Sequence, residues 1–200
     1  MNPPIKLVHP AEALVLARVA PAVRERAAAV RLMLFDVDGV LTDGGLYYGE
    51  AGETLKRFHV LDGHGLKLLT QSGVKVALVT GRSSLIVSRR AAELGIADVM
   101  QDVRDKSAAL NEISQRHGIA LNETGFMGDD LIDLPAMQRA GFAASVPNAP
   151  DYIVQSAHWV ASRQGGNGAA RECCDLLLAA RGRLGSYLMA QPLFGDGVIQ

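Results

Sequence analysis

Two aspartates after a short apolar segment are the residues of this sequence with the clearest chemical potential. Asp36 and Asp38 end a predicted buried strand at 32–36, and Gly39 allows a sharp turn behind them. Open α/β sheets bind ligands at the carboxyl ends of such strands. Alternation along the strand places both carboxylates on one side, so their repulsion calls for a positive charge between them, most simply a divalent cation. The alternative is a surface turn with two solvated aspartates, which the apolar segment disfavours.

Three further polar segments follow at later strand or helix ends. Thr80 and Arg82 flank a glycine after an apolar run, and Lys106 opens a predicted helix. Asp129 belongs to the segment Gly-Asp-Asp, which follows a later strand, and Asp133 comes shortly after it. Each segment alone is typical of an ordinary turn or helix start. Their order favours one shared site, because the carboxyl ends of parallel strands meet at the same edge of a sheet.

These residue types suit phosphoryl transfer. The carboxylate of Asp36 can attack phosphorus and form an acyl phosphate, which splits hydrolysis into two steps. Asp36, Asp129 and the backbone carbonyl of Asp38 form an all-oxygen set that suits Mg²⁺. Lys106 supplies a fixed positive charge and Thr80 a hydrogen bond to a phosphoryl oxygen. Asp38 can protonate the leaving alkoxide and afterwards activate water.

The elements that position these residues alternate between strand and helix. This rhythm predicts an α/β three-layer sandwich with a mostly parallel sheet. Further strands are predicted at 74–79, 98–101, 124–127, 142–146 and 157–160. Helices are predicted at 10–30 with a break near Pro21, and at 63–72, 83–94, 105–117, 131–140 and 167–181. A hairpin is expected from 46–48 and 54–58. We divide the chain into an N-terminal helical extension (1–30), a catalytic domain (31–182) and a tail without a clear period (183–200).

The motifs resemble those of the haloacid-dehalogenase phosphohydrolase superfamily, and within it the 3-deoxy-D-manno-octulosonate 8-phosphate (Kdo 8-phosphate) phosphatases. The matching segments are DVDGVLTDGGLYY, KRFHVLDGHGLKLL, VTGR, GDDLIDLP and QGGNGAAREC. The resemblance implies hydrolysis of Kdo 8-phosphate in lipopolysaccharide precursor synthesis, with Asp36 as nucleophile and Asp38 as acid and base. It implies Mg²⁺ ligation by Asp36, Asp38 and Asp129. It also implies contacts to the sugar phosphate from Asp38, His59, Val60, Leu61, Asp62, Gly63, Lys67, Arg82, Arg90 and Lys106. Leu61 departs from the arginine that relatives often carry.

The spacing of the motifs predicts that no cap domain is present. Residues 43–74 hold only a hairpin and one helix, and residues 80–106 only a helix and a short strand. A small substrate would leave such a site wet, and water weakens its electrostatics. The substrate is therefore a macromolecule, or a neighbouring subunit supplies a lid. Tyr47, Tyr48 and Phe58 on the hairpin favour a lid, and the resemblance implies a homotetramer.

Composition limits the partners and the compartment. A net charge of −1 argues against a nucleic-acid binder, which needs a basic face. The apolar stretch 11–20 contains Glu12 and Arg18 and is too short to span a membrane, and it lacks the features of a signal peptide. Cys173 and Cys174 have no metal-ligand spacing and are expected as helix core residues in a reducing compartment. We therefore expect a cytoplasmic protein.

Three other functions fit part of the pattern. A signalling receiver domain uses similar residues, but its acidic pair comes first and its phospho-acceptor in the middle. A non-catalytic haloacid-dehalogenase-like domain with a binding or regulatory role is disfavoured because no residue needed for catalysis is missing. A phosphatase for another eight- or nine-carbon keto-sugar phosphate stays open, since the sequence does not decide among these sugars.

Overall fold

A six-stranded sheet whose neighbouring strands are all parallel forms the centre of the structure, a computed structural model that describes residues 9–189. The strands lie in the order β5-β4-β1-β6-β7-β8. They are β1 (Leu32–Phe35), β4 (Lys75–Val79), β5 (Asp98–Met100), β6 (Thr124–Met127), β7 (Phe142–Ser145) and β8 (Trp159–Val160). All six fall within the predicted strands, so these predictions are confirmed.

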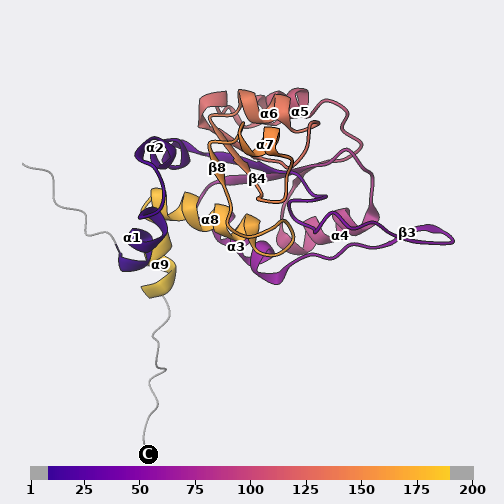
Figure 1. Ribbon diagram of the computed structural model, residues 1–200, viewed down its shortest axis with the longest axis horizontal. Helices are drawn as coiled ribbons and strands as arrows, with labels where there is room; N and C mark the ends of the chain where they lie inside the picture. The colour runs from indigo at the N-terminus through magenta and orange to yellow at the C-terminus, as the bar shows by residue number, and fades with distance from the viewer. Residues whose placement is uncertain (1–8, 190–200) are drawn as a thin grey trace, which may run out of the picture.

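Helices cover both faces of the sheet (Figure 1). One face carries α5 (Lys106–His117), α6 (Leu134–Arg139) and α7 (Asp151–Val154), and the other carries α3 (Val60–Gln71), α4 (Leu85–Leu94) and α8 (Ala169–Ala180). Strands β1, β6 and β7 are buried along their whole length, as expected for a sheet covered on both faces. Cys173 and Cys174 are buried in α8. The predicted three-layer α/β sandwich is confirmed.

The strand order reverses beside the first strand. From β1 the chain moves outward through β4 and β5, then returns to the other side of β1 and moves outward through β6, β7 and β8. The carboxyl ends of β1 and β6 therefore flank the crevice in which open α/β sheets bind ligands. Asp36 follows β1 and Asp129 lies two residues beyond β6, so the topology brings these aspartates together.

Some elements differ from the predictions. Helix α3 begins at Val60 rather than residue 63, because the His59 side chain accepts a hydrogen bond from Leu61 N and caps its first turn. Helix α6 begins at Leu134 rather than residue 131, because the segment before it forms a turn around Asp133. Helix α7, the 3₁₀ helix η1 (Leu121–Glu123) and helix α9 (Leu184–Met189) were not predicted. Short helices of this kind carry too few residues to show a period.

The insertion between β1 and β4 is a projecting hairpin and one helix. Strands β2 (Tyr47–Gly49) and β3 (Gly52–Leu55) pair antiparallel and extend from the side of the molecule in Figure 1. The predicted hairpin is confirmed, but its second strand lies at 52–55 rather than 54–58, because the turn between the strands is shorter than expected. Leu46, Tyr48 and Leu55 are about half exposed. Between β4 and β5 lies only α4. Within residues 9–189 neither position holds a cap domain, so the capless prediction is confirmed.

The terminal helices pack against one another. Helix α1 (Pro10–Leu16) contacts α8 and α9, and α2 (Pro21–Ala29) contacts α8. The break near Pro21 is confirmed. Glu12 is buried and accepts a hydrogen bond from Gly185 N at 2.9 Å, which joins α1 to α9. The division into extension, domain and tail stays a prediction, and residues 190–200 of the predicted tail lie outside the described residues. No helix within 9–189 is long and apolar enough to cross a membrane.

Candidate active site

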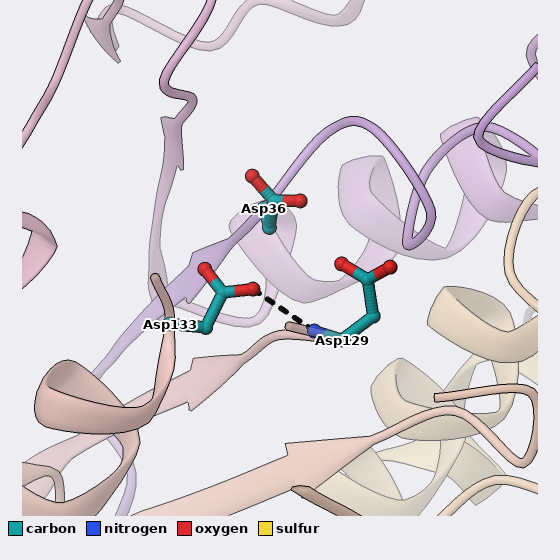
Figure 2. Close-up of side chains that lie close together, drawn as sticks. All are labelled: Asp36, Asp129 and Asp133. Atoms are coloured by element: carbon teal, nitrogen blue, oxygen red, sulfur yellow. Dashed lines mark hydrogen bonds between the residues drawn. The ribbon is translucent and has the colours of Figure 1, made fainter. Parts of the chain in front are cut away.

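Asp36 lies buried at the carboxyl end of the central strand β1. Its backbone N donates to Met127 O at 2.9 Å, which continues the pairing with β6 beyond the end of the strand. Its side chain is only 6% exposed, and Oδ1 lies 2.5 Å from Lys106 Nζ. Figure 2 shows that the carboxylates of Asp36, Asp129 and Asp133 gather at this edge of the sheet. The predicted nucleophile therefore occupies the crevice beside the switch in strand order.

Lys106 and Asp133 form an ion pair beneath Asp36 and Asp129. Lys106 Nζ also lies 2.5 Å from Asp133 Oδ1. The other oxygen of Asp133 accepts hydrogen bonds from the backbone N of Asp129 (3.0 Å) and Asp130 (3.1 Å). Asp133 is fully buried, so its carboxylate fixes both the lysine and the turn that presents Asp129. Burial acts to lower the pKa of Lys106, but the charges of Asp36 and Asp133 outweigh it and raise that pKa, which keeps the ammonium charged.

The site carries an excess of negative charge. One oxygen from each of Asp36, Asp129 and Asp133 lies within 4.8 Å of the others, and one ammonium faces these three carboxylates. Burial, and after it the charge of Asp133, raises the pKa of Asp36 and raises that of Asp129 to about 6. When all three carboxyl groups are ionised, they carry two more negative charges than Lys106 balances, and one divalent cation would neutralise that excess. The oxygen donors and this charge fit Mg²⁺.

Within this triad, Asp36 and Asp129 are the residues suited to hold a metal. Both oxygens of Asp133 are occupied by Lys106 and by the backbone N–H groups. Asp36 uses only its Oδ1 oxygen in the ion pair with Lys106, and Asp129 forms no ion pair with any residue in 9–189. Of the three predicted metal ligands, Asp36, Asp38 and Asp129, two therefore have carboxylates suited to a metal at this position. Asp133 holds Lys106 and the turn that carries Asp129.

The carboxylate of Asp38 lies in a different environment from the one we expected. It forms an ion pair with Lys56 Nζ and accepts a hydrogen bond from Thr80 Oγ1 at 3.5 Å. We expected Asp36 and Asp38 to share one cation between their carboxylates, and this expectation is wrong: Asp36 pairs with Lys106 and Asp38 with Lys56. Only the backbone carbonyl of Asp38 stays a candidate for the metal.

Gly39 allows the turn after Asp38 to pack against Asp129. Its φ of +99° lies in the left-handed region, and a Cβ built on it would overlap the Asp129 carboxylate. Behind the turn, Thr42 Oγ1 accepts hydrogen bonds from Gly39 N (3.3 Å) and Gly44 N (3.2 Å). The loop that carries Asp38, the acid–base candidate, therefore packs directly against Asp129, a candidate metal ligand.

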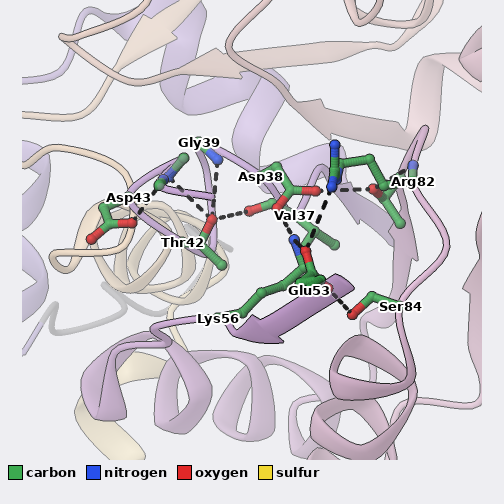
Figure 3. A network of polar contacts seen from close by, with 12 residues as sticks. Val37, Asp38, Gly39, Thr42, Asp43, Glu53, Lys56, Arg82 and Ser84 are labelled. Carbon is green, nitrogen blue, oxygen red and sulfur yellow. Dashed lines mark hydrogen bonds and ion pairs between the residues drawn. The ribbon is translucent and has the colours of Figure 1, made fainter. Parts of the chain in front are cut away.

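A polar network joins Asp38 to the hairpin (Figure 3). Glu53 on β3 lies 2.9 Å from Lys56 Nζ and 3.7 Å from Arg82 Nη2, and it accepts a hydrogen bond from Ser84 Oγ at 2.6 Å. Arg82 Nη2 also donates to the Tyr48 hydroxyl at 2.6 Å. Burial acts to lower the pKa of Lys56, but hydrogen bonds to Asp38 and Glu53 outweigh it and raise that pKa. The predicted substrate residue Arg82 thus lies between the hairpin and the strand end.

Comparisons with known proteins agree with this geometry. A family model described as haloacid dehalogenase-like hydrolase matches residues 88–172. The Kdo 8-phosphate phosphatase of Salmonella typhimurium is 42% identical over 166 residues, which cover 83% of this chain and 88% of that protein. The crystal structure of a Moraxella catarrhalis Kdo 8-phosphate phosphatase in complex with magnesium ion, phosphate ion and KDO is 41% identical with a TM-score of 0.82, covering 84% and 97% of the two chains.

This chain belongs to the Kdo 8-phosphate phosphatase family. A cobalt-bound member from Haemophilus influenzae is 38% identical, with a TM-score of 0.80 and coverage of 83% of this chain and 97% of that one. The resemblance seen in the sequence motifs is confirmed, and so is the haloacid-dehalogenase-like fold.

Several residues that the family resemblance assigned to the substrate lie around the start of α3. His59 caps the helix, and Val60 and Leu61 are exposed at the rim. Gly63 lies directly under the guanidinium of Arg90, since a Cβ there would overlap Arg90 Nη2. These residues stay candidates for substrate contact.

Two of the assigned substrate residues have other surroundings. Asp62 is buried, and its two oxygens accept hydrogen bonds from Gly168 N (3.2 Å) and Arg171 N (2.8 Å) at the start of α8. The geometry therefore favours a cap on α8 over the substrate contact that the resemblance implied, because the side chain is buried and each of its oxygens already accepts a hydrogen bond. Lys67 lies exposed on α3, two turns away from the cap residue His59. A contact between Lys67 and a substrate bound at Asp36 has no support within 9–189.

Three residues of the phosphatase site were given no catalytic or binding role from the sequence: Lys56, Glu53 and Asp133. Lys56 stands in a motif segment of the family, but no spacing rule links it to Asp38, which lies 18 residues earlier. Asp133 was expected only to favour the start of a helix through its charge. Its link to Lys106 depends on the packing of α5 beside the turn after β6, which local sequence does not reveal.

Proposed function

We propose that this protein hydrolyses Kdo 8-phosphate to Kdo and inorganic phosphate through an aspartyl phosphate on Asp36, in lipopolysaccharide precursor synthesis. The observation that carries the proposal is the buried Asp36, held by Lys106 beside Asp129 at the switch in strand order. It occurs in a chain 41–42% identical to Kdo 8-phosphate phosphatases over most of its length.

The first step is attack by Asp36 on phosphorus. A bond forms between the carboxylate oxygen and phosphorus while the ester bond to the sugar oxygen breaks, and Asp38 in its protonated form gives the leaving oxygen its proton. Lys106 stabilises the negative charge of the transferring group, and the Thr80 hydroxyl, which donates to Asp38 in the structure, joins it when its single O–H turns to a phosphoryl oxygen. In the second step Asp38 takes a proton from water, whose oxygen attacks phosphorus and releases Asp36.

Asp36, Asp129 and the backbone carbonyl of Asp38 are the proposed magnesium ligands. When bound, the ion reduces the repulsion between the anionic nucleophile and the anionic phosphate. Asp133 keeps Lys106 and the Asp129 turn in position, and Gly39 lets the loop close on Asp129.

The rim supports the proposed substrate class. His59, Val60, Leu61 and Gly63 lie at the start of α3, Arg82 follows the end of β4, and Arg90 lies in the middle of α4 with its guanidinium over Gly63. Guanidinium groups bind carboxylates well, so Arg82 and Arg90 suit the carboxylate of a keto-acid sugar. Leu61 cannot supply the charge that an arginine would, which keeps other eight- or nine-carbon keto-acid sugar phosphates as the second candidate.

The proposed assembly is a homotetramer in the cytoplasm, with no nucleic-acid or membrane partner. The absence of a cap within 9–189 leaves the site open, and the exposed apolar residues of the hairpin offer a surface for neighbouring subunits. A neighbour that covers the site would exclude water above Asp36 and strengthen its electrostatics.

Release of inorganic phosphate from a panel of sugar phosphates tests this function. We expect the highest kcat/KM for Kdo 8-phosphate, loss of activity in excess chelator with recovery in Mg²⁺, and no turnover by Asp36→Asn. Comparable kcat/KM for glucose 6-phosphate and Kdo 8-phosphate would contradict the substrate, and turnover by Asp36→Asn would contradict the mechanism.

A further inference from the structure

We propose that Lys56 is a positioning residue for Asp38, and that Glu53 holds Lys56 in place, so that the base of the hairpin orients the acid–base carboxylate. This inference rests on the proposed function, because it concerns the residue that passes the proton to the sugar oxygen. Nothing in the family motifs assigns a role to the contacts among these three side chains.

The carboxylate of Asp38 is held at both oxygens. Oδ1 forms its ion pair with Lys56 Nζ, and Oδ2 accepts the hydrogen bond from Thr80 Oγ1. The Asp38 side chain is 17% exposed, so one side of it stays open to a bound substrate. Without substrate, the two contacts fix the plane of the carboxylate, and Lys56 keeps its contact when the Thr80 hydroxyl turns to the phosphoryl group. General acid catalysis requires this orientation because the proton must lie within hydrogen-bond reach of the leaving oxygen.

Lys56 is placed to orient Asp38 rather than to bind the substrate. Its side chain is 1% exposed, and its ammonium is paired with two carboxylates, Asp38 and Glu53. Arginines or lysines that bind a soluble phosphate or carboxylate need an open face, and Arg82, with 40% of its side chain exposed, has one. A buried ammonium with two carboxylate partners has little capacity left for a third anion.

Glu53 is the second support. Its Oε2 accepts the hydrogen bond from Ser84 Oγ at 2.6 Å, and Ser84 is the cap position of α4. Glu53 is therefore anchored to the body of the protein, and it pairs with the same ammonium as Asp38. Burial acts to raise the pKa of Glu53, but hydrogen bonds from Ser84 and Lys56 outweigh it and lower that pKa, which keeps the carboxylate charged.

The backbone fixes Lys56 from two directions. Lys56 directly follows β3, so the hairpin sets one side of it. Two residues later, Phe58 pairs antiparallel with Thr42, the residue that supports the turn after Asp38. The segment 56–58 therefore runs along the loop that carries Asp38, and a shift of the hairpin base would move the ammonium and the carboxylate together.

The test compares two substrates with different leaving groups in Lys56→Met and Glu53→Gln. The rate of phosphoenzyme formation is measured in single-turnover experiments with Kdo 8-phosphate, whose alkoxide needs a proton, and with p-nitrophenyl phosphate, whose leaving group does not. We expect Lys56→Met to slow the Kdo 8-phosphate reaction about tenfold or more and the aryl reaction much less, with KM for Kdo 8-phosphate changed by less than about twofold. Glu53→Gln should also slow the Kdo 8-phosphate reaction more than the aryl reaction, but by a smaller factor.

The control is Lys75→Met, which removes an exposed lysine at the start of β4 and should leave both rates unchanged. Equal losses with both substrates would overturn the proposal, and so would a raised KM for Kdo 8-phosphate at unchanged kcat, which would make Lys56 a substrate ligand. If Lys56→Met does not fold, Glu53→Gln decides by the same criterion. If the wild-type protein cleaves p-nitrophenyl phosphate but not Kdo 8-phosphate, the proposed substrate fails, and Lys56 is then tested with whichever alkyl phosphate the wild type hydrolyses.

Discussion

Lys106 places its ammonium 2.5 Å from a carboxylate oxygen of Asp36, although the two residues are 70 positions apart in the chain. The lysine comes from the first turn of α5 and the aspartate from the end of β1. Both side chains are almost completely buried, so their attraction is weakly screened by water. Asp36 must attack an anionic phosphate, and it is already paired with a cation. The same ammonium can stabilise the negative charge of the phosphoryl group during transfer.

Removal of Lys106 should lower both activity and stability. In Lys106→Met, Asp36 and Asp133 lose the ammonium that lies between them, and two buried carboxylates and the partly buried Asp129 face one another. We expect kcat to fall by about a hundredfold or more, and the free energy of unfolding in chelator to fall by about 3 kcal/mol. Urea titrations and phosphate-release assays measure these effects, with Lys75→Met as the control for loss of a lysine. A variant with wild-type stability in chelator would show that the pair does not hold this edge of the sheet.

Magnesium should stabilise the folded protein through Asp129. A ligand that binds only the folded state at a hundred times its Kd adds about 2.7 kcal/mol, so the wild-type Tm should rise on addition of Mg²⁺. Asp129→Asn should abolish most of that rise. Asp130→Asn is the matched control, because Asp130 is adjacent but exposed and should keep the wild-type response. An equal Mg²⁺ response in both variants would place the metal elsewhere.

Asp62 should affect stability and leave substrate binding unchanged. Asp62→Ala removes both acceptors at the start of α8, so we expect the free energy of unfolding to fall by about 1–2 kcal/mol. Asp62→Asn keeps one acceptor oxygen and should lose less. KM for Kdo 8-phosphate, measured at a temperature where both variants are folded, should stay within about twofold of wild type. A large rise in KM with unchanged stability would restore the substrate contact that the resemblance implied.

His158 should make the protein less stable at mildly acidic pH. Burial, and after it the nearby charge of Arg26, lowers the pKa of His158 from 6.5, and its Nδ1 accepts a hydrogen bond from Ala143 N at 2.8 Å. The unfolded chain therefore binds the proton first, and the contribution of His158 to stability is lost as the pH falls below about 6.5. His158→Asn keeps an acceptor without titrating, so its unfolding free energy should fall less than that of wild type between pH 7.5 and 5.5. If the unfolding free energies of wild type and His158→Asn fall equally over this pH range, His158 does not have this role.

The hairpin should carry the contacts between subunits. Leu46→Ser with Leu55→Ser makes two exposed apolar positions of the hairpin polar, and we expect native mass spectrometry to show a tetramer for wild type and smaller species for the double variant. Leu14→Ser on α1, where the leucine is 75% exposed, is the control and should stay tetrameric. Activity on dilution is measured in parallel. A monomer with full kcat/KM toward Kdo 8-phosphate would contradict the proposal that neighbouring subunits complete the site.

The parallel sheet and its central carboxylates were predictable from local sequence. Four apolar residues before Asp36 favour a strand covered on both faces, and such strands place their carboxyl ends at one edge. For the same reason the segment before Asp129 could be assigned to that edge. The absence of a cap followed from the short spacing between the motifs. These features depend on burial pattern, chain length and motif order, which are properties of the sequence itself.

The partners of the charged groups were decided only by the tertiary structure. Asp36 and Asp38 are two residues apart, yet one pairs with Lys106 from α5 and the other with Lys56 from the end of the hairpin. Asp62 lies in a motif segment but caps α8, more than a hundred residues away. The sequence shows the type of each residue and, through periodicity, the face of the helix or strand on which it lies. Which distant group neutralises it depends on how helices and loops pack around the sheet, because an ion pair forms only where the folded backbone brings two charges within a few ångströms.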